Sequence, residues 1–317
     1  MKKIFFILST LVLLPATAMC KTSGSCAPLD EDNNEIGSCT WTLDGDTLTF
    51  SGQGPMKDYG TITQNGLGTT DAPWNDRNAD LNTGSLYQIR NVVVEDGITS
   101  VGKNALSAAS NITSIKIGDG VKNIGEFAFY CANKRSLSPL NLDLGKGIET
   151  LGPSSFHGNK IDNLILPEGL KSIGTAALRD VYGSVVLPNS LEYVGPVQFS
   201  ARLQSLVLPA HLIEKNGISI TSIFKSGISK LYCPQEKEDF CVQLIEKIKN
   251  RDDFEENFAQ NISYETYEKK GDRYFFDGTA YKSIKDFHNN EPVKRIYTID
   301  EANDVAGKTN TFTIRYR

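Results

Sequence analysis

The sequence predicts an α/β solenoid in which short parallel strands alternate with irregular or helical return segments. Two observations lead to this prediction. A six-residue pattern (apolar, two polar residues, then apolar-x-apolar) recurs along the middle of the chain. A second pattern of apolar residues and one glycine follows most copies of the first. A β-hairpin is expected to cap the repeats at their start, and a small α+β domain is expected after them.

The first pattern marks the strands. Its final apolar residues, from Val94 to Leu208, are separated by 23, 27, 22, 21 and 21 residues. Apolar-x-apolar is the periodicity of a strand with one buried face. One such strand cannot bury its own apolar side, so stacked copies must share a continuous core. The clearest copies are IRNVVV (89–94), ITSIKI (112–117), IDNLIL (161–166), LQSLVL (203–208) and ISKLYC (228–233), with degenerate copies ending at Leu144 and Leu187.

The second pattern marks the return segments, which align without gaps in five copies. Apolar residues fall four and seven positions after each strand end, and a glycine and a large apolar residue follow. The glycine is expected to allow a positive φ or a close backbone approach where the chain turns back. The glycines are Gly102, Gly125, Gly152, Gly174 and Gly195, and the closing residues are Leu106, Phe129, Phe156, Leu178 and Phe199.

These units resemble the BspA-like (treponemal-type) leucine-rich repeat family of bacterial secreted and surface proteins. The resemblance is clearest in LILPEGLKSIGTAAL, which fits the unit (x)LxLPxxLxxIGxxAF. The string CTWTLDGDTLTFSGQGPMKDY, followed by APWND, is similar to the segment that precedes the repeats in many such proteins. The resemblance covers about residues 38 to 233, although the copy after Leu208 has lost the glycine register. It implies protein binding or adhesion, not catalysis.

Five regions are expected along the chain. They are a signal peptide (1–18), an N-terminal region with a β-hairpin cap (19–85), the leucine-rich repeats (86–235), a helical C-terminal cap (236–263) and a small α+β domain (264–317). In the first, Lys2 and Lys3 precede an apolar run that is too short to span a bilayer, and Ala16-Thr17-Ala18 fits signal peptidase cleavage. The hairpin is expected at residues 40–51 around Asp44-Gly45-Asp46, and most of residues 52–85 are expected to be loop. In the last region, strands are expected at 295–299 and 311–316, with a short helix at 300–305.

Export permits disulfides, because secreted proteins fold in an oxidising environment. Cys26 and Cys39 bracket an acidic loop, and Cys233 and Cys241 bracket a second short polar loop. Each pair is a candidate disulfide, although spacing alone leaves the connectivity open. Cys131 lies inside a repeat and is expected to be a small buried hydrophobe. A zinc site is disfavoured, because the chain has no CxxC motif and its three histidines are scattered.

Charge and motifs exclude several classes of function. The formal net charge is −5, and it becomes −7 without the two lysines of the leader. A mildly acidic chain without a basic cluster is a poor nucleic-acid binder. No later segment is apolar enough over ~20 residues to span a membrane. No nucleophile elbow, zinc-protease or nucleotide-binding motif is present, so no enzyme activity and no cofactor are expected.

The candidate partner site lies on the strand face. The middle residue of each apolar-x-apolar strand should point away from the core, and four consecutive ones are apolar: Ile165, Val186, Val207 and Tyr232. A contiguous exposed apolar strip commonly marks a binding site for a protein partner. Two alternatives remain open: β-branched residues favour strands in any case, or the C-terminal domain covers the strip. The alternative functions are an enzyme or carbohydrate-binding accessory protein with its site near Tyr264 to Tyr281, or a structural periplasmic protein.

Overall fold

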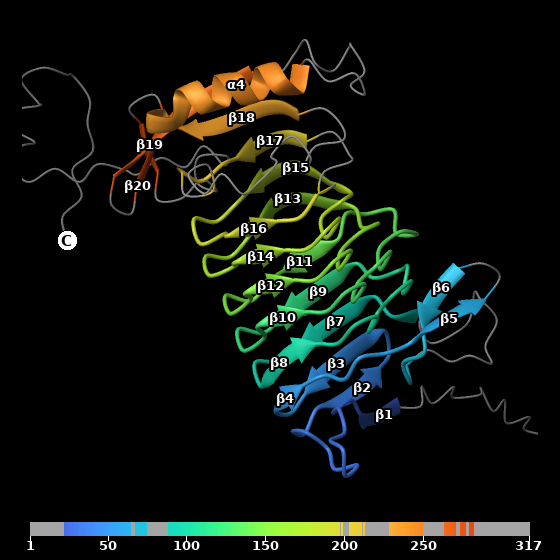
Figure 1. The fold of residues 1–317 in the computed structure, drawn as a ribbon. Coiled ribbons are helices and arrows are strands. Elements are labelled where there is room, and N and C mark those ends of the chain that lie inside the picture. The colour runs from blue at the N-terminus through green and yellow to red at the C-terminus, as the bar shows by residue number, and fades with distance from the viewer. Residues whose placement is uncertain are drawn as a thin grey trace, which may run out of the picture.

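The computed structural model of the chain describes residues 22–64, 67–74, 88–196, 198, 203–210, 212, 228–249, 263–270, 273–276 and 279–281. In these residues the chain winds into stacked coils, and strands from successive repeats lie side by side (Figure 1). The predicted leucine-rich repeat solenoid is confirmed. The predicted signal peptide at residues 1–18 lies outside the described residues.

The six-residue patterns form strands of two sheets. The first sheet runs in the order β1 (Thr22–Ser25), β2 (Thr40–Asp44), β3 (Thr47–Ser51), β7 (Asn91–Val94), β9 (Ser114–Ile117), β11 (Asn141–Asp143). The second runs in the order β13 (Ile161–Ile165), β15 (Val181–Val186), β17 (Leu203–Val207), β18 (Ile228–Pro234), β19 (Ser263–Lys270), β20 (Arg273–Phe276), β21 (Thr279–Tyr281). Neighbouring strands from β3 to β11 and from β13 to β19 are parallel, as stacking of equivalent coils requires.

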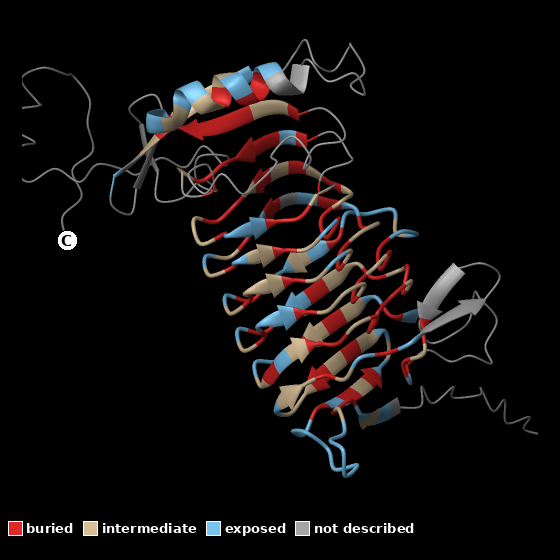
Figure 2. Ribbon diagram, in the orientation of Figure 1, coloured by how far each residue is buried: buried red, intermediate tan, exposed pale blue. Residues whose placement is uncertain are grey.

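The return segments contain short strands instead of the expected irregular or helical structure. These strands form one more sheet, in the order β16 (Tyr193–Val194), β14 (Ser172–Ile173), β12 (Thr150–Leu151), β10 (Asn123–Ile124), β8 (Ile98–Val101), β4 (Gly54–Pro55). The reason is that each return segment pairs its backbone with the preceding coil. The Gly152 amide, for example, donates to the Ile124 carbonyl at 2.8 Å. Figure 2 shows that both sets of strands carry buried positions.

A glycine recurs at the same position in successive coils because neighbouring coils pack closely there. A Cβ at Gly125 would lie 2.6 Å from the Lys103 nitrogen, and one at Gly174 would lie 2.5 Å from the Pro153 nitrogen. Close approach is therefore the property that these glycines supply. The left-handed backbone falls two residues later, where Asn104, Phe127, Ser154 and Ala176 have φ between 51° and 55°.

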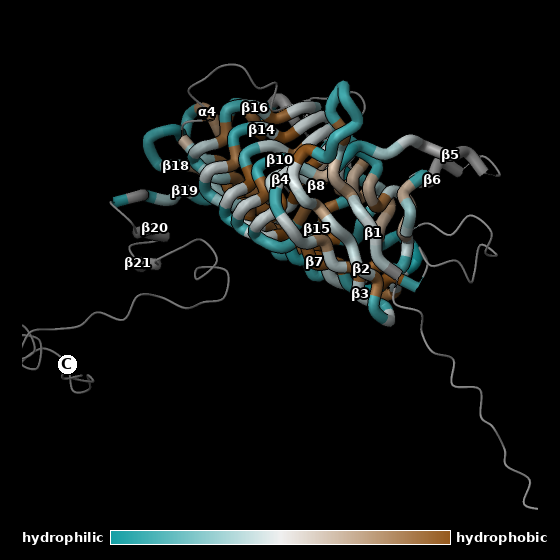
Figure 3. Tube along the Cα trace, turned by 90° about the horizontal axis from the view of Figure 1, so that it is seen from below, coloured by the Kyte–Doolittle hydropathy of each residue, from teal (hydrophilic) through white to brown (hydrophobic). Residues whose placement is uncertain are grey.

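The core runs through the stack without interruption. The closing residues Leu106, Phe129, Phe156 and Leu178 are fully buried. Phe129 and Phe156 stack with centroids 5.1 Å apart and ring planes at 9°. Figure 3 shows the hydrophobic residues lying within the coils and hydrophilic residues towards their rims. Burial of this continuous apolar surface is the main stabilising contribution to the stack.

The N-terminal hairpin continues the first sheet. β2 and β3 pair antiparallel around Gly45, which has φ 60°, and β3 then pairs parallel with β7 of the first repeat. The hairpin predicted at residues 40–51 is therefore present. Residues 52–85 were expected to be mostly loop, but their described part also contains β4 and a small antiparallel hairpin of β5 (Thr61–Gln64) and β6 (Leu67–Thr70).

The C-terminal end of the stack carries the predicted helix. A 3-10 turn (Gln235–Lys237) leads into α4 (Glu238–Lys249), whose residues Cys241, Leu244 and Ile245 are buried. β19 pairs parallel with β18, so residues 263–270 extend the solenoid sheet. The strands expected at 295–299 and 311–316 and the helix expected at 300–305 lie outside the described residues. The domain boundaries stay predictions.

Candidate functional site

Two disulfides stand at opposite ends of the described stack. Cys26 is bonded to Cys39, and Cys233 is bonded to Cys241, with Cα–Cα distances of 5.0 and 6.5 Å. Both predicted pairs are therefore confirmed. The first links the loop before the hairpin to the start of β2, and the second links the end of β18 to α4. Cys131 is a free cysteine and is buried, as expected for a small hydrophobe.

Loss of the first disulfide should destabilise the protein measurably. Cys26→Ser/Cys39→Ser is expected to lower the free energy of unfolding by about 3 kcal/mol, because the bond restricts the unfolded chain across 13 residues. Urea unfolding without reductant would measure the loss. Cys131→Ala is the control, and it should keep its sensitivity to reductant. An unchanged urea midpoint in the double variant would contradict the prediction.

The four candidate partner residues lie on adjacent strands, as predicted. Ile165 pairs with Val186, Val186 with Val207, and Val207 with Tyr232. Ile165 is 44% exposed and Val186 is half-buried, but Val207 is 1% exposed and Tyr232 is 6% exposed. The expectation of a continuous four-residue exposed strip is therefore wrong at Val207 and Tyr232.

The burial of Tyr232 has a structural cause. It lies opposite Glu265 of β19, a strand that begins about thirty residues later in the chain. Lys230 forms an ion pair with Glu265, and its Nζ lies 5.3 Å from the Tyr232 ring centroid. Val207 is flanked by Val186 on one side and Tyr232 on the other. Of the four candidate residues, only Ile165 and Val186 are therefore open to solvent, and we call these two the strand-face patch.

A cysteine, a histidine and an aspartate meet at one small pocket. Cys131, His157 and Asp180 line a cavity of about 300 Å³, and His157 Nε2 lies 3.6 Å from Asp180 Oδ2. Burial raises the pKa of the Cys131 thiol and lowers the pKa of His157. The thiol therefore stays protonated at neutral pH, which is not its nucleophilic form. The arrangement does not support nucleophilic catalysis by Cys131.

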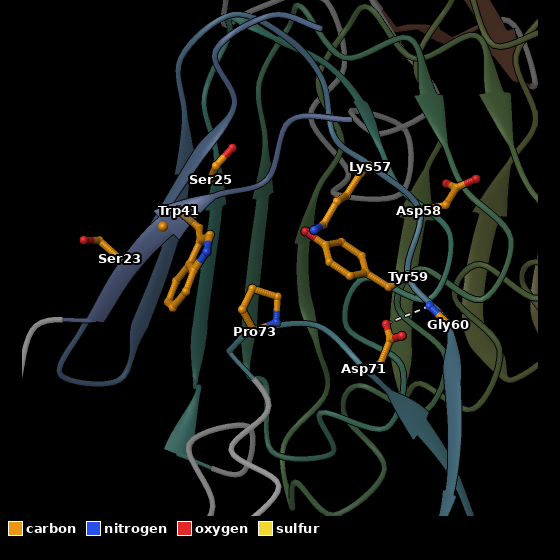
Figure 4. A pocket seen from close by; sticks show the side chains of 10 residues that line it. Ser23, Ser25, Trp41, Lys57, Asp58, Tyr59, Gly60, Asp71 and Pro73 are labelled. Atoms are coloured by element: carbon orange, nitrogen blue, oxygen red, sulfur yellow. Dashed lines mark hydrogen bonds between the residues drawn. The ribbon is translucent and has the colours of Figure 1, made fainter. Parts of the chain in front are cut away.

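A larger pocket lies in the N-terminal region, where no candidate site was expected from the sequence. It has a volume of about 500 Å³ and lies between β1 and the segments 57–60 and 71–73 (Figure 4). Its aromatic wall belongs to a cluster in which Trp41, Tyr59 and Phe50 each pack edge-on against Trp74. The lining residues are Ser23, Gly24, Ser25, Trp41, Lys57, Asp58, Tyr59, Gly60, Asp71 and Pro73.

The polar groups of this pocket, which we call the cap pocket, are fixed by the backbone. Asp58 Oδ1 accepts from the Lys103 amide at 2.7 Å, and Asp71 Oδ1 accepts from the Gly60 amide at 2.7 Å. Burial, followed by the charge of Asp71, raises the pKa of Tyr59. The Tyr59 hydroxyl therefore stays protonated and able to donate. The aromatic residues of this cluster lie in the strings CTWTLDGDTLTFSGQGPMKDY and APWND, but neither string shows that they meet around a pocket.

The alternative site expected near Tyr264 to Tyr281 is only partly described. Tyr264 is half-buried, and its hydroxyl donates to Glu238 Oε1 of α4 at 2.9 Å. The Tyr267 hydroxyl is buried and donates to the Leu208 carbonyl at 2.9 Å. These two tyrosines therefore attach β19 to the helix and to the last repeats. Within the described residues, no helix combines the length and the apolar character needed to cross a membrane.

Solved structures that are similar to part of this chain include three bacterial proteins. A leucine-rich repeat protein from Eubacterium ventriosum is 20% identical, with 61% of this chain and 45% of that chain covered and a TM-score of 0.46. A leucine rich cell surface protein from Faecalibacterium prausnitzii is 18% identical, with coverage of 62% and 55% and a TM-score of 0.38. The pneumococcal vaccine antigen PcpA is 14% identical, with coverage of 66% and 48% and a TM-score of 0.38.

This chain spans about half the length of those solved chains. No curated protein matches it significantly. The model of the BspA type leucine rich repeat region matches residues 84–201 and 139–250, in six copies. These matches together cover more than half of the chain and coincide with the stacked coils described above. The chain belongs to the BspA-type leucine-rich repeat family.

Proposed function

We propose that this chain is an exported protein of the cell surface or exterior that binds a protein partner through the strand-face patch. Three observations support export and binding. The first residues fit a signal peptide. Two disulfides are present, and disulfides persist mainly outside the reducing cytosol. Leucine-rich repeats present an extended sheet surface of the kind that solenoid proteins use to bind other proteins.

The exposure of Ile165 carries the proposal. A large aliphatic side chain that is 44% exposed at the end of β13 is open to a partner, and half-buried Val186 lies opposite it on β15. Lys116 and Asp143 are exposed on the neighbouring strands β9 and β11. An apolar centre with a polar border is the usual anatomy of a protein interface. Binding of a partner accounts for this exposed surface without a catalytic site.

The test is binding of residues 19–317 to immobilised extracellular-matrix and envelope components. Ile165→Glu/Val186→Glu should weaken saturable binding by about tenfold or more, because a charge would then have to be buried at the centre of the contact. Leu137→Glu is the matched control, since Leu137 is 99% exposed in the loop inserted between two repeats. Circular dichroism would first establish that each variant is folded. Equal binding by the double variant and the wild type would overturn the proposal.

A further inference from the structure

We infer that the cap pocket is a binding site for a short neutral saccharide. The pocket belongs to the N-terminal region, before the first repeat, and it shares no residue with the strand-face patch. The inference therefore goes beyond the proposed protein-binding function, and either can fail without the other. It rests on two buried polar atoms without partners, on one glycine, and on the mixture of groups in the lining.

Two aromatic side chains of the pocket wall carry unsatisfied hydrogen-bonding groups. Trp41 is 3% exposed and Tyr59 is 5% exposed, and neither Trp41 Nε1 nor the Tyr59 hydroxyl has a partner among the described residues. In Figure 4 these two groups face each other across the pocket. A buried polar group without a partner costs about 1–3 kcal/mol. A ligand that accepts from both groups would recover that cost.

The neighbouring Trp74 shows that the fold can provide a hydrogen-bond acceptor for a buried indole N–H without a ligand. Trp74 lies in the same cluster, and its Nε1 donates to the Ala105 carbonyl at 2.9 Å. Its rings pack 5.6 Å from Trp41 and 4.9 Å from Tyr59, centroid to centroid. The difference between the two tryptophans is therefore one of position. Trp74 points into the repeats, whereas Trp41 lines the pocket.

Gly24 of β1 pairs with Trp41 across the strands and leaves room for the indole to lie against its backbone. A Cβ at this position would lie 2.8 Å from Trp41 Nε1, closer than real Cβ contacts come. Any side chain at residue 24 would therefore push the indole out of its place in the pocket wall. Ser23 and Ser25 on either side place two further hydroxyl groups at the pocket. The backbone of β1 thus forms the wall of the pocket beside the Trp41 indole.

The lining selects the chemistry of the ligand. Lys57 carries one positive charge, and Asp58 and Asp71 carry two negative charges, so an anionic ligand would be repelled. A wholly apolar ligand would leave the indole and the phenol unpaired. Sugar hydroxyls both donate and accept, so they can pair with the carboxylates, the ammonium, the indole and the phenol together. The apolar face of a sugar ring would also pack against the aromatic wall.

Tryptophan fluorescence provides a direct test, because the chain has only two tryptophans and both belong to this cluster. Residues 19–317 would be titrated with glucose, galactose, mannose, N-acetylglucosamine, lactose and cellobiose. At least one of these should produce a saturable change in fluorescence. A sulfated sugar and a short neutral peptide would be titrated in parallel, and neither should do so.

Two variants locate the site. Tyr59→Phe removes only the unpartnered hydroxyl, so it should weaken saccharide binding about tenfold and leave the thermal midpoint unchanged or slightly higher. Gly24→Ala should block binding by displacing the indole that carries the donor. Tyr193→Phe is the matched control, since Tyr193 is 49% exposed on β16, and it should bind as the wild type does. Absence of saturable change with every neutral sugar, or equal binding by Tyr59→Phe, would overturn the inference, as would binding of the peptide or the sulfated sugar alone.

Discussion

Gly152→Ala is expected to lower the free energy of unfolding by about 3 kcal/mol or more, near the upper end of the range for overpacked sites. A Cβ at this position would lie 2.7 Å from the Glu126 nitrogen and 2.8 Å from the Gly125 carbonyl carbon. Both atoms belong to the backbone of the preceding coil, so no side chain can move aside. Relief would require separating two coils that are joined by the hydrogen bond from the Gly152 amide to the Ile124 carbonyl.

Urea unfolding followed by circular dichroism would measure this loss, with Gly45→Ala as the matched control. Gly45 has φ 60°, but a Cβ there would meet nothing within 4 Å. Its substitution should therefore cost only about 1 kcal/mol, from the left-handed backbone alone. A larger loss at Gly45 than at Gly152 would show that contact between coils is not the reason for the glycine column.

The repeat itself could be predicted from the sequence because its signals are local. Each coil repeats the same apolar columns within 21 to 27 residues, so the strands and the buried positions follow from periodicity. The two disulfides could also be proposed from the sequence, since each joins cysteines that bracket a short loop. The sheet of the return segments was not predicted, because strands of two residues such as β10 and β12 leave no readable period.

The candidate sites were harder to predict, since they depend on residues that are distant in sequence. Alternation correctly placed Ile165 and Val186 on an open face, but it could not show that β19 lies beside Tyr232. The cap pocket combines residues from β1, β2 and two later segments, and the strings at 39–59 and 72–76, which contain several of them, do not show that they meet. Strand periodicity gives the direction of a side chain, whereas its surroundings depend on which segments meet in the fold.

Asn159→Ala is expected to lower the free energy of unfolding by about 3 kcal/mol or more, through the loss of three buried hydrogen bonds. Asn159 is fully buried. Its Nδ2 donates to the Phe129 carbonyl at 2.7 Å and to the Phe156 carbonyl at 2.8 Å, and its Oδ1 accepts from the Asn133 amide at 2.7 Å. The Asn159 side chain thus joins two coils. It also supplies the acceptor for the Asn133 amide, for which the turns provide no backbone partner.

Two further variants show whether hydrogen bonding, and not volume, causes the loss. Asn159→Asp keeps the size of the side chain but replaces its amide donor with a carboxylate, which would face two carbonyl oxygens in the interior. It should therefore destabilise the protein at neutral pH at least as much as Asn159→Ala. Asn123→Ala changes an exposed asparagine on β10 and should alter stability by less than about 0.5 kcal/mol. Equal stability of Asn159→Asp and the wild type in urea unfolding would contradict the prediction, because the buried amide would then not be the group that joins these coils. Apolar packing of Phe129 on Phe156 would then have to hold the two coils together.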